Sequence, residues 1–288
     1  MAQLLKLLFV TALMSVQAEA ADPTSTLKRI AASGEFRIGF VPDAPPMSYV
    51  DADGKTVGYS IALCRHIAGE VKKALKLTDL DIIYVPLIAP EERLRAVEQS
   101  SVDIECGATT VTLSRRERVD FSLMTFITGG AVASRMDAAI PTTTSLSGKK
   151  IAVIEGTTTE TALKRFMEVN EFKIKFRNIA THEEGIRLLG EGKVDGYASD
   201  RTMLIGQVLR SAEAGKYTIT RDAFSFEPYA LMLARGDTEF RLVVDRALAK
   251  LFRSARIRRL YYDWFGRFGE PMTPIVEAMY EFQAVTDK

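Results

Sequence analysis

The sequence predicts an α/β protein with two lobes, each a mostly parallel sheet flanked by helices, joined by two hinge strands. Short apolar runs alternate with amphipathic segments, which indicates strands connected by helices. This alternation occurs twice, before and after a polar threonine-rich loop at residues 141–145. Two extended segments, at residues 126–134 and 229–235, are suited to cross between the units. The expected division is a first lobe of residues 21–128 and 233–288 and a second lobe of residues 129–232.

The first twenty residues read as a secretory signal peptide. Lys6 precedes an apolar run at residues 7–16, and Ala18 and Ala20 stand two positions apart, so we expect cleavage after Ala20. The run is too short to span a bilayer comfortably, and no second long apolar stretch follows. With no cysteine at the cleavage site, a lipid anchor is not expected. The mature protein should be soluble and located in the periplasm.

The charge balance excludes several classes of partner. The 288 residues include 38 basic and 37 acidic side chains, matched along the chain, which is not the pattern of a nucleic-acid-binding protein. The sequence has no metal-ligand histidine cluster and no glycine-rich phosphate loop. We therefore expect neither a metal nor an organic cofactor. Nothing in the sequence demands an oligomer, so a monomer is expected.

In the first half, helices and strands are predicted to alternate. The expected strands cover residues 36–41, 80–85 and 102–106, and the expected helices cover residues 27–32, 61–75, 91–98 and 114–118. Pro42, Pro45 and Pro46 predict a constrained loop after the first strand, because proline fixes φ and cannot donate to a ladder. Ser114 and Glu117 have the spacing of a capping box, which predicts a helix start at Ser114.

The second half repeats the alternation. The expected strands cover residues 151–154, 174–179, 194–198 and 217–220, and the expected helices cover residues 161–169, 181–190 and 203–211. Thr157 with Glu160, and Thr181 with Glu184, repeat the capping-box spacing. Two further helices follow the second crossing, at residues 238–252 and around residues 261–265, and an amphipathic tail begins at residue 274.

Cys64 and Cys106 are the two cysteines of the chain. Export would place them in an oxidising compartment, where two thiols can pair. Cys64 lies on the apolar face of a predicted helix and Cys106 ends a predicted strand, so two buried, unpaired cysteines are the alternative. Both possibilities stay open at this point.

The stretch of residues 102–122 predicts a receptor for a carboxylate. Its strand ends in Cys106-Gly107-Ala108-Thr109-Thr110, which presents backbone N–H groups and hydroxyls at the carboxyl end of the strand. Arg115 follows in the first turn of the next helix, where the helix dipole favours an anion. The planar guanidinium matches a carboxylate better than an ammonium does. The alternative is that Arg115 is one of several surface arginines.

Five motifs, in this order, carry a resemblance to a known family. They are Gly58-Tyr59-Ser60, residues 102–107, Asp120-Phe121-Ser122, Gly156-Thr157-Thr158 and Trp264-Phe265. The set resembles the family 3 extracellular solute-binding proteins of polar amino-acid ABC importers. The likeness covers the mature chain to about residue 268 and is strongest to the glutamate/aspartate-binding members, which carry a similar Glu-Cys-Gly-Ser-Thr-Thr stretch.

The resemblance implies a type II periplasmic binding fold that captures a small-molecule amino acid between its lobes. An inner-membrane ABC permease would be the partner. By this resemblance Arg115 pairs with the ligand α-carboxylate, aided by Thr110 and by Thr158 from the second lobe. Asp200 binds the α-ammonium, for which a carboxylate at a strand end is chemically suited. The two charges would draw the lobes together on one zwitterion.

The resemblance also implies how the ligand side chain is held. Arg93 and His182 match positions that face the distal carboxylate in the acidic-amino-acid binders; the alternative for each is a surface charge on a helix. Val41, Pro90 and Ala108 depart from that pattern, since they replace an arginine and two serines. Ala108 would still line the pocket. These departures put glutamate or aspartate in doubt and leave a neutral or more apolar amino acid, or another carboxylate, as the alternatives.

Two other functions remain open. The same fold resembles secreted cyclohexadienyl dehydratases, which need a general acid or base in the cleft. His66, His182 and Glu105 are the candidates, and a Cys106–His182 pair is a conceivable nucleophile, but the sequence contains no nucleophile elbow. A sensory binding protein would have the same ligand site. We expect a binding protein rather than an enzyme.

Overall fold

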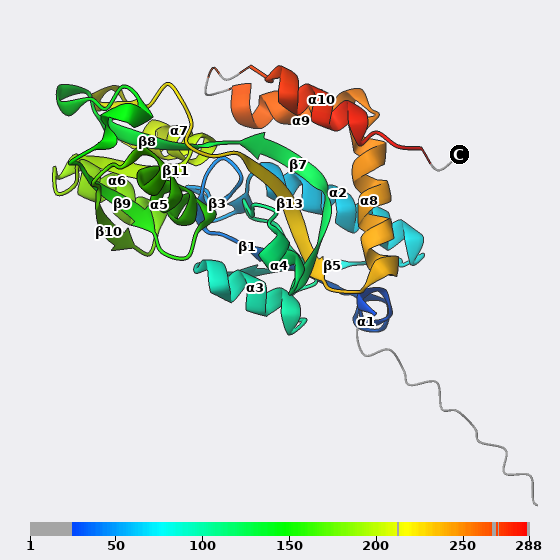
Figure 1. Cartoon of the computed structure of the whole chain (residues 1–288). Coiled ribbons are helices and arrows are strands. Elements are labelled where there is room, and N and C mark those ends of the chain that lie inside the picture. The colour runs from blue at the N-terminus through cyan, green and yellow to red at the C-terminus, as the bar shows by residue number, and fades with distance from the viewer. Residues whose placement is uncertain (1–24, 212, 267–268, 270, 287–288) are drawn as a thin grey trace, which may run out of the picture.

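The computed structural model describes residues 25–211, 213–266, 269 and 271–286. The predicted signal peptide at residues 1–20 lies outside these residues. The chain folds into two lobes, each built on a five-stranded sheet with helices packed around it (Figure 1). Within the described part of the chain, no helix is long and apolar enough to cross a membrane.

The first lobe contains the two ends of the described chain. Its five-stranded sheet is formed by β1 Glu35–Phe40, β5 Asp81–Pro86, β6 Ile104–Glu105, β7 Val119–Thr128 and β13 Glu227–Ala234. Three short strands form a separate sheet: β2 Asp43–Ala44, β3 Ser48–Val50 and β4 Thr56–Val57. The helices are α1 Thr26–Ser33, α2 Tyr59–Ala74, α3 Pro90–Glu98, α4 Leu113–Arg116, α8 Thr238–Phe252, α9 Ala255–Phe265 and α10 Pro274–Phe282.

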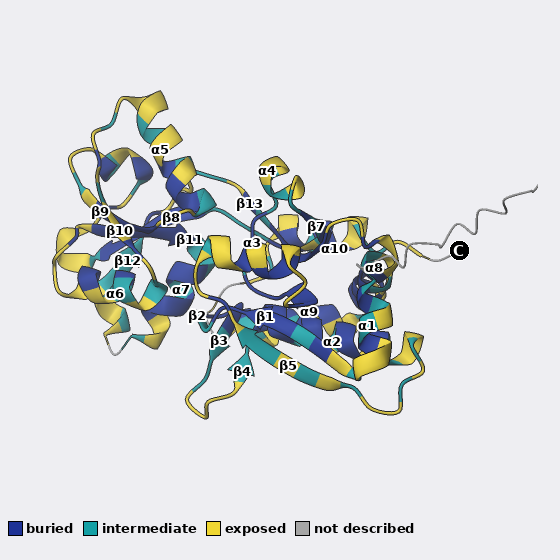
Figure 2. Ribbon diagram, turned by 90° about the horizontal axis from the view of Figure 1, so that it is seen from below, coloured by how far each residue is buried: buried dark blue, intermediate teal, exposed yellow. Residues whose placement is uncertain are grey.

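The second lobe is formed by the middle of the chain. Its strands are β8 Gly130–Arg135, β9 Lys150–Ile154, β10 Lys175–Ile179, β11 Gly196–Asp200 and β12 Tyr217–Ile219. Its α-helices are α5 Thr158–Asn170, α6 His182–Gly190 and α7 Arg201–Arg210. Figure 2 shows that its central strands are buried while its helices expose one side.

Both sheets are mixed rather than mostly parallel. The first has the order β5-β1-β6-β13-β7 and the second the order β10-β9-β11-β8-β12. In each sheet the strands joined by crossover helices pair in parallel, and the remaining two pairs are antiparallel. The difference arises because the crossing strands β7, β8 and β13 are part of the sheets and run against their neighbours.

The two crossings predicted from the sequence lie side by side as paired strands. β13 pairs with β7 from Ala234 opposite Val119 to Glu227 opposite Thr128, and β7 continues through Gly129 into β8 (Figure 1). β13 therefore lies in the first sheet along its full length, including residues 227–232, which the sequence analysis assigned to the second lobe. On its other side β13 pairs with β6, at Met232 and Leu233.

Local signals predicted two helix caps correctly and one incorrectly, although α5 begins at Thr158, three residues before the expected start. The hydroxyls of Thr157 and Thr181 accept hydrogen bonds from the backbone N–H groups three residues later, as the capping spacing predicted. The predicted cap at Ser114 is wrong. Thr112 caps α4 instead, accepting from Arg115 N at 3.1 Å. Because Thr112 lies two residues earlier, the helix begins at Leu113.

Two strand predictions also needed correction. The strand expected over residues 102–106 is reduced to Ile104 and Glu105, because the segment then turns away to build the site. The loop expected between the prolines contains a short strand, since Asp43 and Ala44 pair with Tyr49 and Ser48. Pro42 and Pro45 flank this strand, so proline bounds the ladder without interrupting it.

Cys64 and Cys106 form a disulfide that joins α2 to the end of β6. Both cysteines are fully buried in the core of the first lobe. The bridge lies directly before Gly107 and Ala108, which lead into the site. Of the two possibilities left open by the sequence, the structure has the pair.

Candidate functional site

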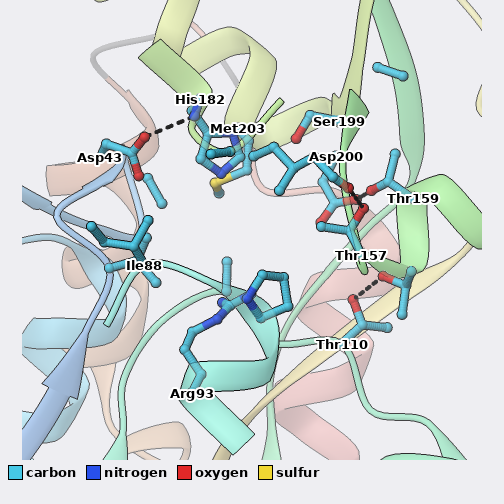
Figure 3. A pocket seen from close by; sticks show the side chains of 18 of the residues that line it. Asp43, Ile88, Arg93, Thr110, Thr157, Thr159, His182, Ser199, Asp200 and Met203 are labelled. Carbon is cyan, nitrogen blue, oxygen red and sulfur yellow. Dashed lines mark hydrogen bonds between the residues drawn. The ribbon is translucent and has the colours of Figure 1, made fainter. Parts of the chain in front are cut away.

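A small cavity lies between the lobes, at the ends of strands from both sheets. The space available to the centres of water-sized atoms is about 50 Å³, several times the volume that a single water molecule needs. All seven residues predicted from the sequence line this cavity: Arg93, Ala108, Thr110, Arg115, Thr158, His182 and Asp200. Figure 3 shows Asp43 and Ile88 on one side of it, and Thr110, Thr157 and Asp200 on the other.

Arg115 presents a half-buried guanidinium to the cavity from the first lobe. Its Nη1 donates to the carbonyl oxygen of Thr110 at 2.7 Å, which fixes the side chain against the loop that follows β6. Burial, and then the nearby Arg93, lower the pKa of Arg115 to about 10, so the side chain remains charged at neutral pH. Among the residues that the structure describes, Arg115 forms no ion pair. The guanidinium is therefore positioned to receive an anion.

The second lobe offers the N-terminus of α5 at the same place. Thr157 caps this helix by accepting from Glu160 N at 3.1 Å, and Thr157, Thr158 and Thr159 all line the cavity. The first N–H groups of a helix have no partner within the helix, and the dipole favours negative charge there. Arg115 and this helix start thus form two walls suited to a carboxylate.

Glu227 is a site residue that the sequence analysis missed. It is buried at the start of β13, and its Oε2 accepts from the Thr110 hydroxyl at 2.7 Å and from the Thr158 hydroxyl at 2.8 Å. Ser225 donates to its other oxygen at 2.6 Å. The hydroxyl protons of Thr110 and Thr158, expected to face a ligand, are therefore directed to Glu227 in this structure. No local pattern marks Glu227, because its partners are far away in the sequence.

Asp200 presents a buried carboxylate from the second lobe. It ends β11, and it accepts hydrogen bonds from the Thr159 hydroxyl at 3.0 Å and from the Tyr229 hydroxyl. Burial, and then the nearby Glu227, raise the pKa of Asp200 to about 6. Within the described part of the chain, Asp200 has no ion-pair partner. A cationic group of a ligand would therefore stabilise the buried negative charge of Asp200.

Arg93 reaches the cavity from α3, and its charge is already partly compensated. Its Nη1 lies 3.8 Å from Glu105 Oε1 and 3.4 Å from the Thr109 hydroxyl, which donates to Glu105 Oε2 at 2.8 Å. Glu105 is fully buried beneath the cavity, and burial raises its pKa. Glu105 does not line the cavity and supports Arg93 from below.

His182 and Asp43 meet at the same end from opposite lobes. The backbone N–H of His182 donates to Asp43 Oδ2 at 2.8 Å, and its Nδ1 lies 2.5 Å from the Tyr197 hydroxyl. Burial lowers the pKa of the His182 imidazole, so the ring is neutral at pH 7. Asp43 could not be recognised as a site residue from the sequence, because the prolines around it indicated only a constrained loop.

The three departures noted in the sequence, Val41, Pro90 and Ala108, also line the cavity. They contribute apolar surface at its wall. The enzyme candidates do not come together: His66 lies outside the cavity with its ring against Ala247 O, and Cys106 is bonded to Cys64. The conceivable Cys106–His182 nucleophile is excluded because a disulfide sulfur is not a free thiolate.

Two α/β lobes, two paired crossing strands and a small charged cavity between the lobes define a bilobal binding protein for a small polar molecule. Residues 36–267 match the model of the bacterial extracellular solute-binding proteins, family 3. The chain belongs to this family, whose members bind solutes outside the cytoplasm.

Individual relatives agree with this assignment. The chain is 32% identical over 263 residues to an L-glutamate/L-aspartate-binding protein of Pseudomonas aeruginosa, covering 91% of this chain and 87% of the relative. It is 28% identical to a glutamate/aspartate import solute-binding protein of Escherichia coli, covering 86% and 83%.

A solved structure of an ancestral amino acid-binding protein, described as a precursor of cyclohexadienyl dehydratase, is also similar. It is 26% identical, with a TM-score of 0.72, and the match covers 84% of this chain and all of that one (100%). The predicted family and two-lobe fold are confirmed.

Proposed function

We propose that this protein captures a polar α-amino acid between its lobes and delivers it to the membrane permease of an ABC importer. One observation carries the proposal. Arg115 from the first lobe and Asp200 from the second are oppositely charged, line the same small cavity and have no ion-pair partner among the described residues. A zwitterion supplies the missing partner for both. The names of the relatives support an amino acid as the solute.

In this proposal the α-carboxylate binds Arg115 and the N–H groups at the start of α5. The α-ammonium binds Asp200, with Thr159 and Tyr229 orienting the acceptor oxygens. Thr110 and Thr158 act through Glu227, which joins the two lobes at the carboxylate end. The ligand favours closure because only the closed state brings charges from both lobes onto one molecule.

The proposal also covers the hinge between the lobes, the oligomeric state and the partner. The lobes divide near Gly129 and near the start of β13, and the paired strands β7 and β13 act as the hinge. The protein works as a monomer in the periplasm after removal of its signal peptide. A transporter operon around the gene supports import, whereas an isolated gene favours a sensory partner.

The test is binding of a panel of amino acids to the wild type and to Arg115→Ala by isothermal titration calorimetry. We expect Arg115→Ala to lose every amino acid that the wild type binds, because each one carries the α-carboxylate. The neighbouring Arg116→Ala is the matched control, since Arg116 is exposed and stacks on Phe121. Amino-acid affinity retained in Arg115→Ala contradicts the carboxylate assignment.

We propose no catalytic role. A dehydratase needs a positioned general acid or base, and the groups at this site are arranged as charge partners. The check is incubation of the purified protein with prephenate and arogenate. If either is consumed while no α-amino acid raises the melting temperature, the binding-protein proposal fails, because binding to the folded state alone raises its apparent stability.

A further inference from the structure

We propose that the side-chain end of the cavity selects a neutral carboxamide, so that the preferred ligand is an α-amino acid with an amide side chain rather than a carboxylate. This inference rests on the proposed function, since it assumes that Arg115 and Asp200 hold the α-carboxylate and the α-ammonium. It is carried by Asp43 and His182, which meet on the side of the cavity away from Asp200, and by Arg93, which lines the wall below them in the view of Figure 3.

The charges at this end do not suit an acidic side chain. Asp43 contributes a negative charge, Arg93 a positive one, and His182 is neutral. Glu105 lies 3.8 Å from Arg93 and is either ionised or protonated. The net charge of these four side chains is therefore minus one if Glu105 is ionised and zero if it is protonated. A ligand carboxylate would add a further negative charge in either case. Arg93 could pair with it, but it would also lie close to the Asp43 carboxylate, and like charges repel there.

The hydrogen-bonding groups suit an amide. Asp43 is half-buried, and its Oδ2 accepts from His182 N. None of the hydrogen bonds found among the described residues uses Asp43 Oδ1, which remains an acceptor. Arg93 is a donor only. An amide has an NH₂ group for Asp43 and a carbonyl oxygen for Arg93, whereas a carboxylate has no proton to offer Asp43.

The other classes of side chain fit less well. A lysine or arginine side chain would pair with Asp43 but would meet the Arg93 guanidinium in the same small space. A purely apolar side chain would displace water from Asp43 and Arg93 without offering either of them a further hydrogen bond, which is costly for a binding site. Ile88 and Met203 line the cavity and provide apolar contact for the methylene groups of an amide side chain.

The first experiment measures wild-type affinities for L-glutamine, L-asparagine, L-glutamate and L-aspartate, and for L-lysine and L-leucine, by calorimetry at pH 7. We expect one of the two amides to bind at least tenfold more tightly than either acid. Tighter binding of an acid overturns this inference but leaves the proposed function standing. Binding of no α-amino acid overturns both. Tighter binding of a cationic or apolar amino acid also overturns the inference.

The second experiment uses Asp43→Asn, which keeps an oxygen to accept from His182 N and removes the charge. We expect the preference for amide over acid to fall at least tenfold, because the new NH₂ group can donate to a ligand carboxylate. Asp53→Asn is the matched control: Asp53 lies ten residues later and its side chain is 74% exposed. An unchanged preference in a folded Asp43→Asn protein overturns the inference.

Discussion

Burying the charged carboxylate of Asp200 lowers the stability of the ligand-free protein, and the ammonium of a ligand would offset this loss. Replacing Asp200 with asparagine measures the loss, because it removes the charge. The asparagine has nearly the same shape, accepts one hydrogen bond through its oxygen and removes the charge. In the structure the Asp200 carboxylate accepts hydrogen bonds from Thr159 and Tyr229 and forms no ion pair within the described residues. We therefore expect Asp200→Asn to stabilise the ligand-free protein while it abolishes amino-acid binding.

The magnitude follows from the pKa. Burial, followed by the nearby Glu227, raises the pKa of Asp200 from 3.8 to about 6. Such a difference corresponds to about 3 kcal/mol between the two protonation states. The stabilisation provided by the protonated form is complete below pH 3.8 and is lost as the pH rises through 6. At pH 7.5 the asparagine variant should therefore be more stable by about 3 kcal/mol, and at pH 4 it should have little advantage.

The assay is thermal unfolding of wild type and Asp200→Asn at pH 7.5 and pH 4, with and without ligand. For a domain of this size, about 3 kcal/mol raises Tm by on the order of 6–12 °C. The affinity should fall at least a hundredfold, since removing one partner of a buried ion pair costs about 3–5 kcal/mol. Asp137→Asn, whose side chain is 75% exposed, is the control. A variant that is less stable than wild type at pH 7.5, or that still binds, refutes the reasoning.

Two further predictions concern the first lobe. Val41→Arg should raise the affinity for glutamate or aspartate relative to amide ligands, because Val41 lines the cavity and the arginine adds a positive charge there. The affinities are measured by calorimetry. An unchanged preference would show that residue 41 does not set the selectivity. Replacing both Cys64 and Cys106 by serine should lower the free energy of unfolding by about 4 kcal/mol, since the bridge closes a loop with a sequence separation of 42 residues. An unchanged midpoint in denaturant unfolding would contradict this prediction.

The sequence by itself determined the features that depend on neighbours a few residues apart. The alternation of strands and helices, the caps at Thr157 and Thr181, and the two crossings follow from local patterns and appear in the structure. The sequence also pointed to the stretch around Arg115, which lines the cavity, although a surface arginine stayed open as the alternative. The resemblance to the family added Asp200, Arg93 and His182, and the structure places all of them at one cavity.

Only the tertiary structure decided which groups meet across long distances in the chain. Glu227 receives the Thr110 hydroxyl across 117 residues, and Asp43 receives the His182 N–H across 139 residues. Neither contact leaves a periodic or spaced signal in the sequence, because it exists only once the lobes face each other. The same reason applies to the pairing of Cys64 with Cys106 and to the mixed sheets. The proposed selectivity for the ligand side chain depends on these distant contacts, whereas the proposed zwitterion clamp depends on residues that the sequence and its resemblance already indicated.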